Sequence, residues 1–151
     1  MLAAGIPIDG IGLQMHVNVK SPRDPAKVLA GMKAISDLGL ATQITEMDVS
    51  CPECVPGPAG ELAREQQAKV YGDMLTACLA AKATTPGQGP GCNAFVSWGF
   101  TDKHTWLGSD VHPLPFDAEY QPKEAALEML AVLQHHAAGI RDPTRPWAYE
   151  R

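Results

Sequence analysis

The stretch Leu40–Cys51, LATQITEMDVSC, decides the fold, because it has the composition of a short buried strand and ends in two acids. Side chains alternate along a strand, so two sets are predicted to lie on opposite faces: Thr42, Ile44, Glu46 and Asp48 on one, and Gln43, Thr45, Met47 and Val49 on the other. Acids are poor sheet formers and costly to bury unpaired, but they are tolerated where they do chemistry, as at the mouth of a parallel α/β sheet. Glu46 is therefore a candidate catalytic carboxylate, and an ordinary solvated strand end is the alternative.

Composition excludes several classes of partner. The 151 residues suit one domain, with 45% hydrophobic and 19% charged residues, as in a globular protein. A net charge of −5 without any Lys/Arg run disfavours nucleic acid and anionic membranes, and leaves neutral substrates such as sugars open. No apolar run is long enough to span a membrane, and the N-terminus lacks the pattern of a signal peptide.

Three strand–helix units follow one another along the chain. Strands are predicted over 8–17, 40–49 and 93–99, and helices over 24–39, 61–82 and 123–137. This order predicts an α/β fold with parallel strands and right-handed crossovers. In the last helix we expect Leu127, Leu130 and Leu133 to face inward, and we expect the tail after it to be extended or loosely packed. Three parallel strands leave both sheet edges open, so self-association into a homo-oligomer is expected.

Polar and aromatic residues mark the carboxyl end of each predicted strand. Gln14 and His16 end the first strand, Glu46 and Asp48 end the second, and Trp98 ends the third, with Trp106 in the loop that follows. In a barrel of parallel strands these residues would meet at one face. Carboxylates that cleave glycosidic bonds and indole rings that stack on sugars make carbohydrate the expected substrate class.

Four segments resemble glycoside hydrolase family 10, the endo-β-1,4-xylanases, and they keep the family's order. They are IDGIGLQMH (8–16), GLATQITEMDV (39–49), FVSWGFTDKHTW (95–106) and PLPFDAEYQPKEAA (113–126). The first three resemble the sixth, seventh and eighth strands of the family's (β/α)8 TIM barrel. The resemblance implies a single truncated domain over 1–151, a partial barrel completed by self-association.

The resemblance also implies a role for each matching residue. Glu46 would be the nucleophile of a retaining hydrolase acting on β-1,4-xylan or xylo-oligosaccharides, with His16 hydrogen-bonded to it and Asp48 orienting His16. Gln14, Trp98 and Trp106 would bind the sugar. No cofactor or metal is implied, and the family's secreted enzymes imply an extracellular protein.

Two departures from the family pattern limit these expectations. Met15 stands where the family usually has Gly, and we expect its side chain to pack behind the strand. The family's acid/base glutamate belongs to the fourth strand and has no match here, although retaining hydrolysis needs two carboxyl groups about 5–5.5 Å apart. By its position just after the last predicted strand, Asp102 is the nearest substitute within the chain for this acid/base residue. The chain could be inactive alone, build a site from two copies, or serve as a non-catalytic xylan-binding or interaction module.

The four cysteines allow three readings. Cys78 and Cys92 bracket a loop with a spacing that suits a disulfide, a bridge that family members often carry, and Cys51 and Cys54 suit a tight loop disulfide. A zinc site from all four and a redox CxxC are the alternatives, although the spacings match no zinc ribbon and the CxxC opens no helix. We expect disulfides, and hence an oxidising compartment.

Overall fold

A computed structural model describes residues 1–82, 88–108 and 110–149, whose strands form one parallel sheet. Its central strand pairs with two short strands along one edge and with one longer strand along the other. The strands are β1 (Gly10–Leu13), β2 (His16–Asn18), β3 (Ala41–Ser50) and β4 (Gly91–Ser97), with β3 in the centre. The parallel α/β arrangement predicted from the sequence is confirmed, and the sheet is not closed into a barrel.

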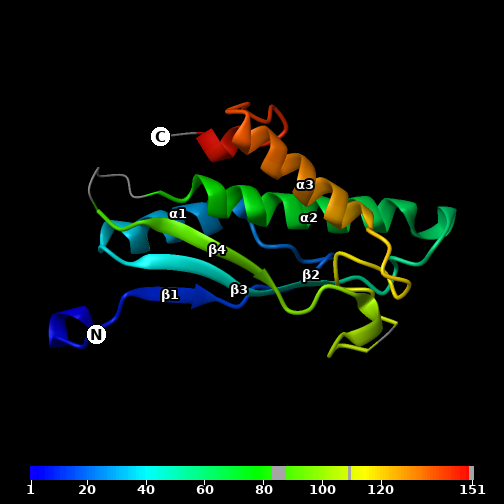
Figure 1. Ribbon diagram of the computed structural model, residues 1–151, viewed down its shortest axis with the longest axis horizontal. Coiled ribbons are helices and arrows are strands. Elements are labelled where there is room, and N and C mark those ends of the chain that lie inside the picture. The colour runs from blue at the N-terminus through cyan, green and yellow to red at the C-terminus, as the bar shows by residue number, and fades with distance from the viewer. Residues whose placement is uncertain (83–87, 109, 150–151) are drawn as a thin grey trace.

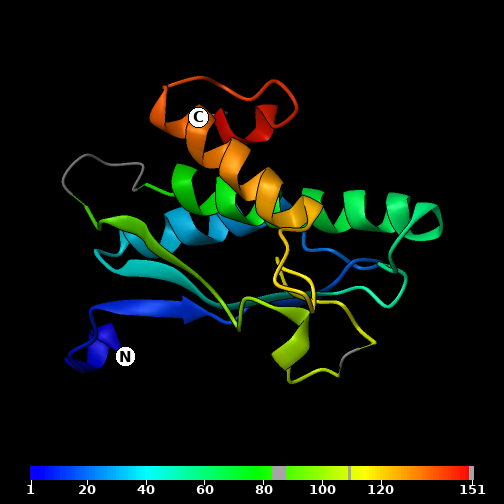
Figure 2. The same cartoon turned by 45° about the vertical axis from the view of Figure 1, so that its right-hand side comes forward.

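Three α-helices lie on one side of this sheet (Figure 1). They are α1 (Pro25–Asp37), α2 (Glu61–Ala80) and α3 (Glu124–Ala137), and short 3-10 turns η1 (Leu2–Ala4), η2 (Pro58–Gly60), η3 (Asp102–His104) and η4 (Pro146–Tyr149) complete the elements. The helices α1 and α2 cover the sheet, and α3 lies across α2 on the side away from the sheet (Figures 1 and 2). The opposite face of the sheet has no α-helix over it in the described part of the chain.

The first predicted strand is broken in the middle, so its prediction as one element over 8–17 is wrong. Met15 has φ 67°, a left-handed conformation that interrupts a strand and that non-glycine residues adopt at a cost. Its side chain packs against the hydrophobic core, as expected. The break leaves β1 before it and β2 after it.

An extra residue in β3 accompanies the break. Leu13 lies opposite Ile44, whereas His16, three residues further on, lies opposite Asp48, four residues further on. The pairing between β3 and β4 also shifts between Ile44 and Met47. A strand with one residue more than its partner carries a β-bulge, which exchanges the faces of all side chains that follow.

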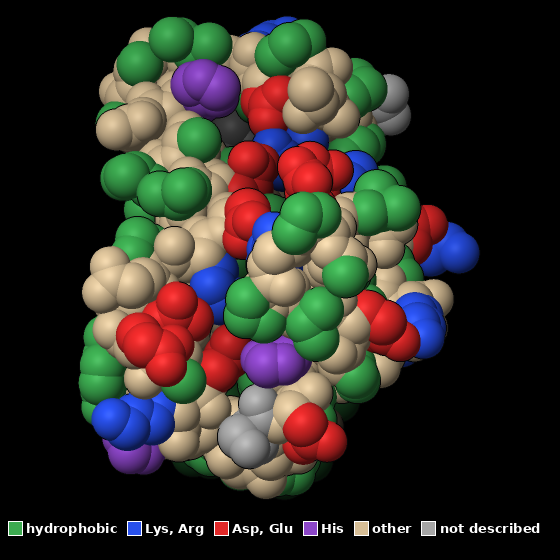
Figure 3. Space-filling model, turned by 90° about the vertical axis from the view of Figure 1, so that its right-hand side faces the viewer, with side chains coloured by type: hydrophobic (Ala, Val, Ile, Leu, Met, Phe, Trp, Pro, Cys, Tyr) green, Lys and Arg blue, Asp and Glu red, His purple; other side chains and the backbone are tan. Residues whose placement is uncertain are grey.

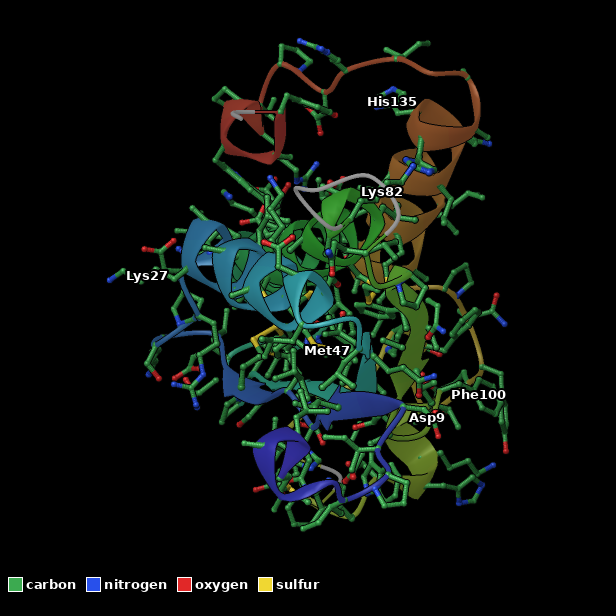
Figure 4. The ribbon with its side chains drawn as sticks, turned by 90° about the vertical axis from the view of Figure 1, so that its left-hand side faces the viewer. Asp9, Lys27, Met47, Lys82, Phe100 and His135 are labelled. Atoms are coloured by element: carbon green, nitrogen blue, oxygen red, sulfur yellow. A yellow bond between two sulfur atoms is a disulfide. The ribbon has the colours of Figure 1, made fainter. Side chains whose placement is uncertain are left out.

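The bulge overturns the predicted faces of β3. Ile44 was expected opposite Met47 and Val49, but all three are fully buried in one core. Met47 lies between α1 and the sheet in Figure 4. The prediction assumed uninterrupted alternation, which fails where the strand gains a residue. After the bulge, Met47 and Val49 point into the core, and Glu46 and Asp48 point away from it toward His16.

The core is organised by α2, whose buried residues run from Gln67 to Cys78. Tyr71 and Met74 pack with the β3 side chains and with Met32 of α1. Both disulfides predicted from the sequence are present: Cys78–Cys92 links the end of α2 to the start of β4, and Cys51–Cys54 closes the turn after β3. None of the described helices combines the length and apolar character needed to cross a membrane.

The inward face predicted for α3 is wrong. Leu127, Leu130 and Leu133 are 56%, 52% and 46% exposed, whereas Ala125 and Val132 are buried. Periodicity indicates an apolar stripe, but α3 packs inward through Ala125, Met129 and Val132. The leucines are left on the outside.

The tail is tightly held, contrary to the expectation of loose packing. Arg145 is buried and pairs with Asp73 of α2 at 2.9 Å, with Glu128 of α3 at 2.6 Å and with Asp142. Trp147 packs against the core. In the upper half of Figure 3, acidic side chains gather around a few basic ones. Buried ion pairs of this kind fix the tail because each charge would be costly to leave unpaired.

Candidate active site

The predicted site residues converge where the parallel strands end. Glu46 and Asp48 lie in the second half of β3, and His16 begins β2 beside them. The backbone N–H of Glu46 donates to the carbonyl oxygen of Gln14 at 3.0 Å, and that of Trp98 donates to the carbonyl of Met47 at 3.0 Å. The side chain of Gln14 is exposed at this edge, so its contact with Glu46 is through the backbone alone.

His16 bridges the two acids. Its Nδ1 lies 2.9 Å from Oδ2 of Asp48, and its Nε2 lies 3.3 Å from Oε2 of Glu46. An imidazole can donate to both carboxylates only when both nitrogens carry a proton. In the neutral form, the shorter contact assigns the proton to Nδ1 facing Asp48, which leaves Nε2 toward Glu46. His16 thus contacts both acids through its two ring nitrogens.

Asp48 is the buried anchor of the group. Its Oδ2 accepts from His16 and also from the indole Nε1 of Trp106 at 2.8 Å. Its Oδ1 is buried with no hydrogen-bond partner among the described residues. A buried carboxylate is stabilised by charge-assisted hydrogen bonds, so these two donors fix its position, and Asp48 in turn orients both rings.

Glu46 differs from Asp48 in its access to solvent. Its side chain is 23% exposed, and His16 is its hydrogen-bond partner among the described residues. A carboxylate held from one side and open on the other can approach a bound molecule. Asp48, fully enclosed, cannot.

Two indole rings flank the imidazole. The ring of Trp106 lies 5.3 Å from that of His16 and the ring of Trp98 lies 6.5 Å from it, both in edge-on geometry. Trp98 and Trp106 are 48% and 60% exposed, although the polar tip of Trp106 is bound to Asp48. Exposed indole faces beside a carboxylate provide surfaces on which sugar rings stack.

The loop that carries Trp106 is held by a buried pair that sequence reasoning missed. Lys123 donates to Oδ2 of Asp102 at 2.9 Å and to the carbonyls of His112 and Leu114, both at 2.8 Å. Burial lowers the pKa of Lys123, although the charge of Asp102 acts in the opposite direction. Asp102 is therefore buried and ion-paired, which removes it as a stand-in proton donor. The two residues are 21 positions apart, so no local pattern connects them.

The segment that contains Val111 and Pro113 closes over the end of β3. The N–H of Val49 donates to the carbonyl of Pro113 at 3.0 Å, and the N–H of Cys51 donates to that of Val111 at 2.9 Å. Tyr71 donates to the same Pro113 carbonyl at 2.7 Å from behind. Burial raises the pKa of Tyr71 well above its ordinary value, and the charges of Asp48 and Asp102 add to the effect. These bonds hold the loop in place around Asp48.

A groove of about 360 Å³ runs along β2 beside Asp48, and Glu46 is not among its lining residues. Its lining joins the site residues to polar side chains that precede α1: His16, Val17, Asn18, Ser21, Arg23, Asp48, Ser50, Trp106 and Leu107. Within the described ranges, no group of three or more His, Cys, Asp or Glu side chains is arranged to hold a metal ion.

Comparison with known proteins gives a consistent family. The model of glycosyl hydrolase family 10 matches residues 1–132. Endo-1,4-beta-xylanase B of Neocallimastix patriciarum is 34% identical over 132 residues, which cover 87% of this chain and 13% of that protein. The chain thus spans a small part of that relative's length.

Solved structures give the same result. The native xylanase 10B of Thermotoga maritima superposes with a TM-score of 0.77 at 30% identity, over 91% of this chain and 40% of that one. The xylanase 10B of Thermotoga petrophila, determined in complex with xylobiose, superposes with a TM-score of 0.74 at 30% identity, over 88% and 38% of the two chains.

Proposed function

Because this chain belongs to glycosyl hydrolase family 10, we propose that it acts on β-1,4-xylan by a retaining mechanism in which Glu46 is the nucleophile. The observation that carries the proposal is the partly exposed carboxylate of Glu46, held by His16 beside two exposed indoles. The xylanase 10B structure that contains xylobiose supports xylo-oligosaccharides as ligands.

In the first step an oxygen of Glu46 forms a bond to the anomeric carbon, and the bond from that carbon to the leaving oxygen breaks. The leaving oxygen takes the bonding electrons and, in xylan, needs a proton. Asp48 and His16 keep Glu46 oriented, and Trp98 and Trp106 hold the sugar ring. Water then cleaves the glycosyl ester and restores the carboxylate.

No residue of the chain matches the family's acid/base motif, so the proposed mechanism has no assigned proton donor. An activated aryl glycoside removes the requirement, because dinitrophenolate leaves without protonation. We expect the protein to release dinitrophenolate from 2,4-dinitrophenyl β-xylobioside, and a mass spectrum to show one xylobiosyl group attached at Glu46. Native xylan should be cleaved much more slowly.

The variant Glu46→Gln keeps the shape and removes the nucleophile, so it should release no dinitrophenolate above background. Glu119→Gln, which changes an exposed glutamate in the loop before α3, is the matched control and should behave as the unmodified protein. Equal release by Glu46→Gln and the unmodified protein would remove Glu46 from the mechanism.

A second candidate function is xylan binding without turnover. It is favoured by the exposed indoles, which would bind sugar whether or not a bond is cleaved. Saturable binding of xylohexaose in calorimetry, with no release of dinitrophenolate, would select this function.

The exposed surface bears on self-association, and the cysteines bear on the compartment in which the protein acts. We propose that the chain self-associates through its open sheet and exposed helix α3. Two disulfides are stable in oxidising compartments, so we also propose that the protein acts outside the cell.

A further inference from the structure

The groove beside the acids has two chemically different ends. One end holds His16, Asp48 and Trp106, and the other holds Asn18 and Arg23. Its volume of about 360 Å³ lies within the range of about 300–1,000 Å³ typical of small-ligand sites. Glu46 does not line this groove, but His16, which contacts Glu46, does, so a chain of sugars that passes His16 and Trp106 can extend toward Arg23.

Arg23 has no ion pair or hydrogen bond within residues 1–82, 88–108 and 110–149. The acids closest to it in sequence are already used. Asp24 accepts from the first backbone N–H groups of α1 and pairs with Lys27, and the side chain of Glu53 pairs with Lys20. Arg23 is exposed and lines this groove as well as a neighbouring cavity beside α1, in a chain whose net charge is −5.

A neutral sugar gives a guanidinium little to bind. Xylose units present hydroxyl groups, which amides and hydroxyls such as those of Asn18 and Ser50 recognise without a charge. A guanidinium, in contrast, has a planar fork of donors that matches the two oxygens of a carboxylate. An unpaired arginine on a sugar groove therefore indicates an acidic sugar.

We propose that Arg23 binds the carboxylate of a uronic acid side chain on xylan, so that the protein prefers acidic xylan to unsubstituted xylan. The proposal rests on the proposed function, because it assumes that the xylan backbone occupies the site at Glu46. Asn18 adds a polar contact. Its Oδ1 accepts from the N–H of Lys20 at 2.8 Å, while its Nδ2 has only a long contact of 3.5 Å with Ser50 and can donate to a sugar hydroxyl.

The test compares two xylo-oligosaccharides of equal backbone length, one unsubstituted and one carrying a single glucuronosyl group, by calorimetry with the 151-residue protein. The acidic ligand should bind about tenfold more tightly, the size expected of charge-assisted hydrogen bonds to one carboxylate. The preference should shrink as sodium chloride is added.

Three variants test whether the preference for the acidic ligand depends on Arg23. Arg23→Gln should bind both ligands equally, with unchanged affinity for the neutral one. Arg23→Lys should keep part of the preference, because it retains the charge but loses the fork. Arg141→Gln removes the same charge from the tail, where the guanidinium lies over the ring of Tyr149, and should bind as the unmodified protein does.

Each other outcome has a distinct meaning. Equal binding of the two ligands by the unmodified protein, or a preference that persists in Arg23→Gln, would overturn the assignment of Arg23 and leave the proposed function standing. Failure of the unmodified protein to bind either ligand would overturn the proposed function, and the assignment of Arg23 with it.

Discussion

At the residue scale, the candidate site depends on how differently two neighbouring acids of β3 are covered. Glu46 and Asp48 both contact His16 and so lie on the same side of β3, yet Asp48 is buried under Trp106 while the side chain of Glu46 is 23% exposed. In the proposed chemistry the accessible acid reacts, and the buried acid orients the imidazole beside it. Residues two apart in a strand share a face, and here the difference in solvent access arises because Trp106 and the segment that bonds to Val49 and Cys51 cover Asp48.

Tyr71, directly behind Asp48, gives the site a pH-dependent stability that can be measured. Its pKa is raised well above the ordinary value by burial and by the charges of Asp48 and Asp102. In the unfolded chain the pKa returns to about 10. Above that pH the unfolded state loses a proton that the folded state keeps, so the unfolding free energy falls as pH rises.

We predict that Tyr71→Phe removes this alkaline loss, as measured by urea denaturation at neutral and at alkaline pH. At neutral pH the variant should be less stable by about 1 kcal/mol, the value of one hydrogen bond, since the Pro113 carbonyl keeps its bond from Val49. The lowered pKa of Lys123 acts in the opposite sense but is common to both proteins. Tyr120→Phe, at the surface, should keep the alkaline loss; an unchanged loss in Tyr71→Phe would contradict the prediction.

At the element scale, two glycines inside helices distinguish open surface from close packing. A Cβ added to Gly31 of α1 would meet no atom within 4 Å. A Cβ added to Gly72 of α2 would lie 2.4 Å from Nη2 of Arg145 and 2.8 Å from Oε1 of Glu128. Both sites would gain equally in helix propensity from alanine, but only Gly72 has a neighbour that must move.

We predict that Gly31→Ala raises the unfolding free energy by about 0.5–1 kcal/mol, the propensity gain alone. Gly72→Ala should lower it by about 1–3 kcal/mol, because the new methyl displaces the buried ion pairs of Arg145. Urea denaturation followed by circular dichroism measures both. A stabilisation of similar size in the two variants would mean that the tail does not pack against α2 as described.

The elements themselves could be predicted from the sequence to different degrees. Helices and strands were found because their apolar periodicities are local, and the capping of α1 by Asp24 lies in the same few residues. The bulge in β3 and the left-handed Met15 could not be found, because both depend on pairing between strands. The face of α3 was misassigned because periodicity shows which side is apolar and not what lies against it.

In the candidate site, too, residues with a local sequence signal could be predicted and residues that depend on tertiary contacts could not. Glu46 and Asp48 stand out because acids in a buried strand are locally anomalous, whereas the roles of His16 and Asp48 follow from the resemblance to glycoside hydrolase family 10. Lys123 and Arg23 were missed because each acts through the tertiary structure, one by an ion pair across a loop and one by lining a groove. A charged residue in an ordinary turn carries no local signal of either role.

At the scale of the whole molecule, the structure leaves apolar surface uncovered on two elements. The leucines of α3 are about half exposed, and Val96 of β4 is exposed at the outer strand of the sheet. Unpaired strand edges and exposed apolar groups favour contact with another protein surface. A second copy of the chain offers both features and can cover them reciprocally in a symmetric pair.

We therefore predict a concentration-dependent increase in mass, measured by size-exclusion chromatography with light scattering. Leu130→Gln should shift the equilibrium toward monomer, because it removes apolar area at the centre of the exposed leucines and disturbs no buried contact. Leu62→Gln, near the start of α2 and 67% exposed against 52% for Leu130, is the matched control and should leave the equilibrium unchanged. A single monomeric mass at every concentration would exclude self-association, whereas equal shifts in both variants would place the contact elsewhere than α3.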